Sequence, residues 1–229
     1  MTTRGNTDQP RPRTHRRVVW RYSLVLLAAA VAATVALWPR TNDTPRRPAV
    51  SSGVSSGATQ RPAADVAAAR VRAQLSPCPA PGRNGQGPGW LRGVRADCLS
   101  DATSIDLGAV LAGRSALINV WASWCEVCRK ELPVLDTYAR SPGAVQVLGV
   151  QILSDPAEGL DMLASLGVHL PSVNDTDGTV TRALHAPAYL PVSYVVTSQG
   201  TIRQVIPPTP FSTPDQIERT VQAMTSGTN

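Results

Sequence analysis

A short apolar run leads directly into a pair of cysteines two residues apart, and a charged, helix-prone segment follows. The stretch is LINVWASWCEVCRKELP, residues 117–133. Residues 116–120 are apolar at both odd and even positions apart from Asn119, as expected of a strand that is covered on both faces. The cysteine pair therefore stands where a buried strand gives way to a helix, which favours a sheet with helices packed on its faces.

The rest of the chain alternates between strand and helix patterns. Two strand-like runs before the central strand predict a β-hairpin extension, and a second hairpin is predicted near the C-terminus. Strands are predicted at residues 91–99, 104–107, 116–120 and 144–152, and in the hairpin at 191–206. Helices are predicted at residues 63–75, 125–139, 156–166, 180–184 and 213–224. This order implies an α/β fold with a mixed central sheet flanked by helices.

The net charge is concentrated at the N-terminus. The chain of 229 residues has a formal charge of +6. Residues 1–50 contain nine Arg and two Asp, whereas residues 51–229 contain 13 Lys or Arg and 14 Asp or Glu. The folded part therefore lacks the positive excess of a nucleic-acid-binding surface, and no nucleic-acid partner is expected.

Residues 22–38, YSLVLLAAAVAATVALW, contain no charged side chain. As a helix they would reach about 26 Å, close to the thickness of the hydrocarbon core of a bilayer. Six Arg precede the segment and three follow it closely, which predicts a single pass through the plasma membrane with a cytoplasmic N-terminus. The alternative is a cleaved secretory signal processed near Ala30, Ala32 and Ala33. Either way the folded part is extracytoplasmic, where disulfides persist.

These boundaries divide the chain into five parts. They are a basic tail at 1–21, a transmembrane anchor at 22–38, a flexible linker at 39–62, a helix with a Pro- and Gly-rich loop at 63–90, and the main domain at 91–226.

A Cys-x-x-Cys pair at the start of a helix has a specific chemical consequence. The unpaired amides and partial positive charge of the helix N-terminus favour a thiolate at the first cysteine, Cys125. Cys128, one turn further on, is placed to attack a mixed disulfide on Cys125 and release the partner. Trp121 and Trp124 are predicted to form a flat apolar surround on which a substrate chain rests.

Two other uses of a cysteine pair fit the sequence less well. Zinc sites usually need two such pairs, or a Cys pair with a His pair. Cys78 and Cys98 do not form a second pair, and His169 and His185 are too far apart in the sequence to act as one. A haem attachment motif needs His directly after Cys128, where the chain has Arg. We therefore predict thiol–disulfide chemistry without a metal ion.

The segment WASWCEVCRKELP resembles the active-site segment of the TlpA and ResA family of membrane-anchored, thioredoxin-like proteins. The similarity extends over about residues 91–224 and includes LPVSYVV, which looks like the cis-proline strand of the thioredoxin fold. The resemblance implies a thioredoxin-like fold in which Pro191 is cis and its loop lies against the cysteine pair. A substrate strand would then pair with the backbone edge beside Leu190. The resemblance implies no cofactor.

The resemblance also bears on polar residues near the cysteines. Asn119 falls where many thioredoxins keep a buried Asp, and Glu131 matches a Glu with a comparable proton-handling role in membrane-anchored relatives. A buried carboxylate there would accept the proton of Cys128, whereas the alternative is a solvated helix residue. Glu126 matches cytochrome-maturation relatives and is predicted to contact substrate, or it is a first-turn Glu favoured by the helix dipole. Val127 replaces the family's usual Pro, so the reduction potential does not transfer.

The other two cysteines, Cys78 and Cys98, lie before the central strand. A structural disulfide between them would pin the Pro-rich loop to the first strand and contribute about 3 kcal/mol on the loop-entropy model. The alternative is a second redox relay, although neither cysteine stands at the start of a helix.

Together these features predict a membrane-tethered, extracytoplasmic thiol–disulfide oxidoreductase. The resemblance implies that it reduces disulfides of exported proteins, with apocytochrome c before haem attachment as the leading client. Electrons would come from a membrane partner of the DsbD or CcdA type. The alternatives are an oxidase or isomerase of exported proteins, and a redox-inert thioredoxin-like module that only binds other proteins.

Overall fold

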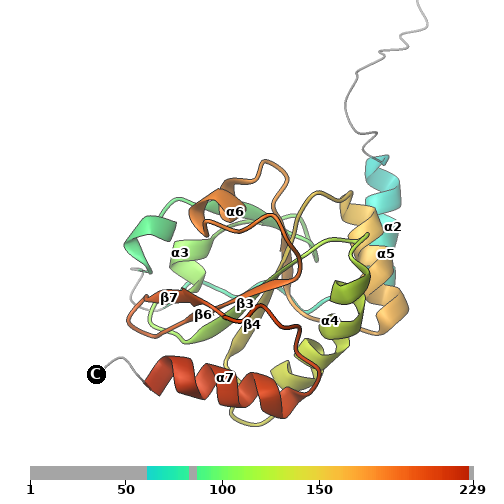
Figure 1. The fold of residues 1–229 in the computed structure, drawn as a ribbon. Coiled ribbons are helices and arrows are strands. Elements are labelled where there is room, and N and C mark those ends of the chain that lie inside the picture. Colours follow the sequence, from blue (N-terminus) through green and yellow to red (C-terminus); the bar gives the residue numbers. More distant parts are fainter. Residues whose placement is uncertain (1–60, 83–86, 227–229) are drawn as a thin grey trace, which may run out of the picture. The chain divides into compact units, whose positions relative to one another are not determined.

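The computed structural model describes residues 61–82 and 87–226. Within them, one mixed sheet has the strand order β2-β1-β5-β4-β3-β6-β7. Figure 1 labels its strands β3, β4, β6 and β7. The strands are β1 (Arg95–Cys98), β2 (Ser104–Asp106), β3 (Ala116–Trp121), β4 (Gln146–Gln151), β5 (Ser172–Asn174), β6 (Val192–Val196) and β7 (Ile202–Gln204). Strands β5, β4 and β3 run parallel to one another, and the other neighbours pair antiparallel. The predicted mixed α/β sheet is confirmed.

Helices lie on both faces of this sheet (Figure 1). The helices are α2 (Ala63–Ala73), α3 (Leu107–Val110), α4 (Glu126–Ala139), α5 (Pro156–Leu166), α6 (Thr179–Ala183) and α7 (Pro214–Ser226). The apolar core on one face includes side chains of α2, α4, α5 and α7, and the core on the other face includes side chains of α3 and α6. Both cores meet at the central strands.

Strand β3 shows why the central run is apolar throughout. Its side chains alternate between the two cores, with Leu117 and Trp121 on the α4 face and Ile118 and Val120 on the opposite face. All four are fully buried. The strand needs apolar residues on both parities because a helical layer covers each face.

The helix ends follow from local chemistry. The Asp155 carboxylate accepts a hydrogen bond from the Ala157 N–H at 2.8 Å, and Pro156 occupies the first turn, where its missing N–H costs no hydrogen bond. Helix α5 ends before Gly167, which has φ 62°. This residue takes the left-handed conformation that terminates many helices. The helix predicted at 156–166 therefore has the predicted bounds.

Several elements differ from the sequence predictions, and helix α3 was not predicted at all. The predicted strand at 91–99 begins only at Arg95, because Gly89–Leu91 forms a 3-10 turn. The predicted helix at 63–75 ends at Ala73, since Gln74 has φ 47°. Strand β5 was not predicted. It pairs with β4 on one side and β1 on the other, and so joins the predicted N-terminal hairpin to the central sheet.

None of the helices within residues 61–82 and 87–226 has the length and apolar character that a bilayer crossing requires. The basic tail predicted at 1–21 and the membrane span predicted at 22–38 lie outside the described residues, as does nearly all of the linker predicted at 39–62.

Candidate active site

The cysteine pair sits where β3 ends and α4 begins. Cys125 is the N-cap residue of α4, and its Sγ accepts a hydrogen bond from the Cys128 N–H at 3.1 Å. The two cysteines are joined by a disulfide with an S–S distance of 2.06 Å. When the pair is reduced, the same N–H and the helix dipole favour a thiolate on Cys125, because both present positive charge to that sulfur.

The two sulfurs differ in access to solvent. Cys125 retains 6 % of its surface, whereas Cys128 is completely buried. An incoming sulfur nucleophile, or a disulfide to be reduced, can therefore reach Cys125 but not Cys128. This asymmetry matches the attacking and resolving positions expected of a dithiol exchange centre.

A buried carboxylate lies beneath the pair. Glu131 is 2 % exposed and stands three residues after Cys128, which places both side chains on one face of α4. Its Oε1 accepts the Phe211 N–H at 2.8 Å, and its Oε2 accepts from Asn119 Nδ2 at 2.9 Å. Burial raises the pKa of Glu131, and these two hydrogen bonds oppose the rise. The alternative that Glu131 is a solvated helix residue is wrong.

The loop before β6 lies beside the cysteine-bearing loop. The Leu190–Pro191 peptide bond is cis, Pro191 is buried and Leu190 is partly buried. Val192 pairs with Val120 in the antiparallel β3–β6 register, so Pro191 falls next to the end of β3, where the active-site loop starts. The structure thus places Pro191 and Leu190 next to the cysteine segment.

The two tryptophans predicted to surround the site differ in their exposure to solvent. Trp121 is completely buried in the core, so the prediction that it offers a surface to substrate is wrong. The alternation of β3 turns its side chain inward beneath α4. Trp124 is 62 % exposed, and its Nε1 donates to the Leu153 carbonyl at 3.0 Å. Leu153 itself is 78 % exposed, and it has φ 47°.

The residues between the cysteines face solvent. Val127 is 45 % exposed. The Glu126 side chain is 73 % exposed and lies 3.9 Å from Arg129 in the first turn of α4. An exposed pair of this kind contributes little to stability. Glu126 is thus exposed to solvent, and its negative charge suits the positive end of the helix. Its predicted contact with substrate stays a prediction.

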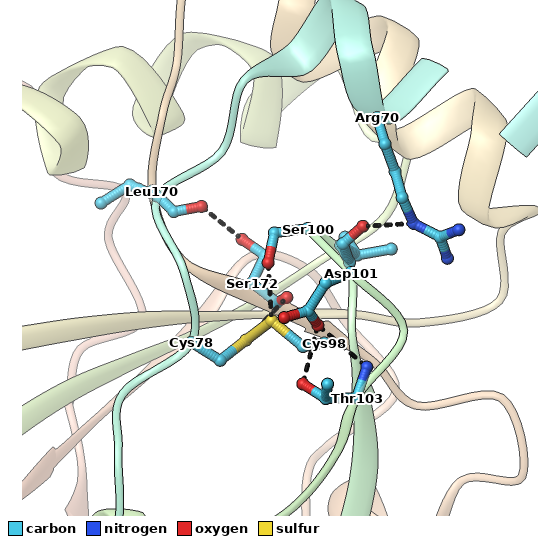
Figure 2. Close-up of a disulfide and its surroundings, with 9 residues drawn as sticks. Arg70, Cys78, Cys98, Ser100, Asp101, Thr103, Leu170 and Ser172 are labelled. Carbon is cyan, nitrogen blue, oxygen red and sulfur yellow. Dashed lines mark hydrogen bonds between the residues drawn. A yellow bond between two sulfur atoms is a disulfide. The ribbon is translucent and has the colours of Figure 1, made fainter. Parts of the chain in front are cut away.

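Cys78 and Cys98 form a second disulfide with an S–S distance of 2.00 Å (Figure 2). Cys98 is the last residue of β1 and is almost fully buried, while Cys78 is half-buried in the loop after α2. Arg70 on α2 donates from Nε to the Leu99 carbonyl at 3.0 Å, directly after Cys98. Neither sulfur lies at a helix N-terminus. The bond therefore ties the loop that follows α2 to β1, the strand between β2 and β5.

Sequence reasoning missed part of the site. Ser193 and Phe211 contact the Asn119–Glu131 pair, and nothing in their local sequence indicates this. Asn119 could be recognised because it is the one polar residue in the apolar run at 116–120. Within the described residues, no group of three or more His, Cys, Asp or Glu side chains could hold a metal ion.

Comparisons with known proteins agree with this geometry. The family model described as Redoxin matches residues 83–218, more than half of the chain. The thiol:disulfide interchange protein DsbE of Pseudomonas aeruginosa is 37 % identical over 99 residues, which are 43 % of this chain and 53 % of that protein. The thiol-disulfide oxidoreductase ResA of Bacillus subtilis is 29 % identical over 99 residues, 42 % of this chain and 54 % of ResA. This chain thus spans about half the length of these curated relatives.

Solved structures support the same fold. A secreted Mycobacterium tuberculosis disulfide oxidoreductase homologous to E. coli DsbE is 27 % identical, with a TM-score of 0.52, and the match covers 59 % of this chain and 98 % of that one. The M. tuberculosis protein dsbF, in mixed oxidised and reduced forms, is also 27 % identical, with a TM-score of 0.54 over 61 % of this chain and 100 % of dsbF. The predicted thioredoxin-like fold is confirmed. The chain belongs to the Redoxin family, and its relatives there are thiol-disulfide oxidoreductases of the TlpA and ResA type.

Proposed function

We propose that this protein is a membrane-tethered, extracytoplasmic thiol-disulfide oxidoreductase that reduces disulfides of exported proteins. The single observation that carries the proposal is the asymmetry of the cysteine pair. Cys125 caps helix α4 and reaches solvent. Cys128 is fully buried and lies on the same helix face as the buried carboxylate of Glu131.

In the first step the reduced protein attacks its client. The Cys125 thiolate attacks one sulfur of the client disulfide, so that a bond forms between Cys125 and that sulfur and the client S–S bond breaks. The other client sulfur leaves as a thiolate and takes a proton from solvent. The amide of Cys128 and the N-terminus of α4 stabilise the attacking thiolate.

In the second step Cys128 resolves the mixed disulfide. Glu131 accepts the thiol proton of Cys128, and the resulting thiolate attacks Cys125 Sγ. The Cys125–Cys128 bond forms, the bond from Cys125 to the client breaks, and the second client sulfur leaves as a thiolate that is protonated by solvent. The client gains two electrons and two protons, and the protein becomes a disulfide. The raised pKa of Glu131 suits it to hold that proton.

The surroundings of Cys125 fit an unfolded or extended client. Trp124, Val127 and Leu153 present exposed apolar side chains beside it, and Leu190 and Pro191 lie at the adjoining loop, where a client backbone can pair. We propose apocytochrome c before haem attachment as the client, as the resemblance of the active-site segment to the TlpA and ResA family implies. A membrane protein of the DsbD or CcdA type would return electrons to the Cys125–Cys128 disulfide.

Insulin reduction tests the enzymatic part of this proposal. The Cys125→Ser variant is expected to lose turnover, because the attacking sulfur is gone. A matched control, Cys78→Ser combined with Cys98→Ala, removes the other disulfide and is expected to keep turnover. Equal turnover by Cys125→Ser and the wild type would refute an enzymatic role and leave only a binding module.

The direction of electron flow and the client need two further measurements. A reduction potential of about −270 mV, the value of thioredoxin, supports a reductase. A potential of about −120 mV, the value of the oxidant DsbA, supports an oxidase. A Cys128→Ser variant cannot resolve its mixed disulfides, so it should trap clients in cells. Trapped clients that are all haemless cytochromes support the cytochrome assignment, whereas a mixed population points to general disulfide handling.

A further inference from the structure

A buried polar group of three side chains lies on the α4 face of the sheet. Asn119 on β3 is directly opposite Ser193 on β6 in the antiparallel register, so both side chains point to the same face. They are 1 % and 7 % exposed, and Leu117 and Trp121, on the same parity of β3, belong to the apolar core. Glu131 reaches this pair from α4. Polar groups in such a place are costly unless each finds a partner.

The hydrogen bonds of this group suit one protonation state. Asn119 Nδ2 donates both of its hydrogens, one to Glu131 Oε2 at 2.9 Å and one to Ser193 Oγ at 3.0 Å. Asn119 Oδ1 is buried and has no hydrogen-bond partner among the described residues. An ionised carboxylate only accepts hydrogen bonds, so this arrangement satisfies Glu131 as an anion.

If Glu131 Oε2 carried a proton, its O–H group and the Asn119 Nδ2–H group would both be donors and would face each other. A half turn of the Asn119 amide removes the conflict, because it exchanges Oδ1 and Nδ2. Oδ1 then has two lone pairs where Nδ2 had two hydrogens, and it accepts the Glu131 hydroxyl and the Ser193 hydroxyl. The Ser193 hydroxyl hydrogen is free to rotate, so Ser193 can accept in the first state and donate in the second. The three side chains therefore pair with one another in either form of the acid, although the turned amide places its two Nδ2 hydrogens where Oδ1 had no partner among the described residues.

We propose that Asn119 and Ser193 are positioning residues that let Glu131 take up and release a proton inside the core, with the Asn119 amide turning over at each transfer. The proposal rests on the proposed function in one respect, that Cys128 is the group which exchanges the proton. When Cys128 is deprotonated for its attack, Glu131 becomes neutral and the amide turns. When the disulfide is reduced again, Glu131 returns the proton to the Cys128 thiolate and the amide turns back.

Among residues 61–82 and 87–226, no charged side chain forms a hydrogen bond or ion pair with Glu131. Helix α4 carries Cys128 three residues before Glu131, on the same helix face. Strands β3 and β6 contribute the neutral Asn119 and Ser193, and the segment before α7 contributes the Phe211 N–H. The pKa of Glu131 is raised by burial and lowered by the two hydrogen bonds that it accepts, and no charged side chain contributes to the shift. In the oxidised protein, where Cys128 is in a disulfide and does not titrate, the pH dependence of the group therefore belongs to Glu131, and the test uses this oxidised form.

The test follows the Asn119 side-chain amide by NMR in the full-length protein in detergent micelles. Its amide proton and nitrogen resonances are recorded against pH, together with the carboxyl carbon of Glu131. We expect both to change with one common midpoint. In Glu131→Gln the pH-dependent change of Asn119 should vanish. An Asn119 amide that stays constant while Glu131 titrates would overturn the proposal.

Ser193→Ala tests the second positioning residue. It leaves one Asn119 N–H without an acceptor when Glu131 is ionised. When Glu131 is neutral and the amide is turned, the substitution removes one of the two hydroxyl groups that donate to Asn119 Oδ1, and the Glu131 hydroxyl remains. An unpaired N–H is the greater cost. The titration midpoint of Glu131 should therefore rise in Ser193→Ala and return in Ser193→Thr, which keeps the hydroxyl.

Ser172→Ala is the matched control, because Ser172 is also buried but its hydroxyl donates to the Leu170 carbonyl, outside this group. It should leave the midpoint unchanged. A midpoint that Ser193→Ala does not move, or that Ser172→Ala moves as much, would overturn the role of Ser193. These readouts do not depend on turnover. A protein inactive towards insulin that still shows the coupled titration would refute the proposed function and leave the amide switch standing.

Discussion

Replacing Cys78 with Ser and Cys98 with Ala together removes the disulfide that ties the loop after α2 to β1. The two cysteines are 20 residues apart, so the bond closes a loop of that length in the unfolded chain. On the loop-entropy model, a loop of this size stabilises the folded state by about 3 kcal/mol. For a folded part of this size, each kcal/mol corresponds to about 2–4 °C, so we expect the Tm to fall by about 6–12 °C.

The variant should still fold, because other contacts hold α2 in place. Ala69 and Ala73 are completely buried in the core. Arg70 donates to the Leu99 carbonyl, and Arg72 pairs with Asp161 on α5 at 2.6 Å. These contacts keep the fold, and the main effect of losing the disulfide is the greater freedom of the unfolded chain.

Urea denaturation of the full-length protein under non-reducing conditions, followed by tryptophan fluorescence, measures the loss of stability. Insulin reduction well below the Tm, measured on the same samples, should match the wild type, because Cys125 and Cys128 are intact. A free energy of unfolding equal to that of the wild type would refute the loop-entropy reasoning. If insulin turnover were also lost, the result would indicate that Cys78 and Cys98 form a redox relay.

Three further predictions concern single side chains. Leu132→Ala should lower the free energy of unfolding by about 2–5 kcal/mol in urea titrations, since the side chain of Leu132 on α4 is completely buried in the core. Asp155→Ala should cost about 1 kcal/mol in the same assay, because it removes the N-cap of α5. Glu131 binds its proton more tightly in the folded than in the unfolded chain, so wild-type stability should fall as pH rises from the ordinary value of 4.5 through the raised pKa. Urea titrations of Glu131→Gln across this window should lack that fall, and parallel curves would contradict the burial argument.

The elements predicted well are those with a strong local signal. The strand at 116–120 and the helix at 156–166 have clear apolar patterns, and the latter has Asp and Pro at its start. Strand β5 has no such signal because it is three residues long, and its pairing with β4 and β1 defines it. A strand that short forms only where neighbouring strands already offer hydrogen-bonding groups.

The residue types and spacing by themselves determined the chemistry of this protein. Two cysteines at the N-terminus of a helix that follows a buried strand form a thiol exchange site wherever that local structure forms, because the helix amides act within one turn. Only the tertiary structure decided how the site is surrounded. The side chain of Trp121 is buried in the core, whereas that of Trp124 is exposed at the surface. Glu131 accepts a hydrogen bond from Phe211, 80 residues away, and Asn119 donates one to Ser193, 74 residues away. Contacts at such separations depend on strand register and on which face each helix covers, and neither is encoded in a local stretch of sequence.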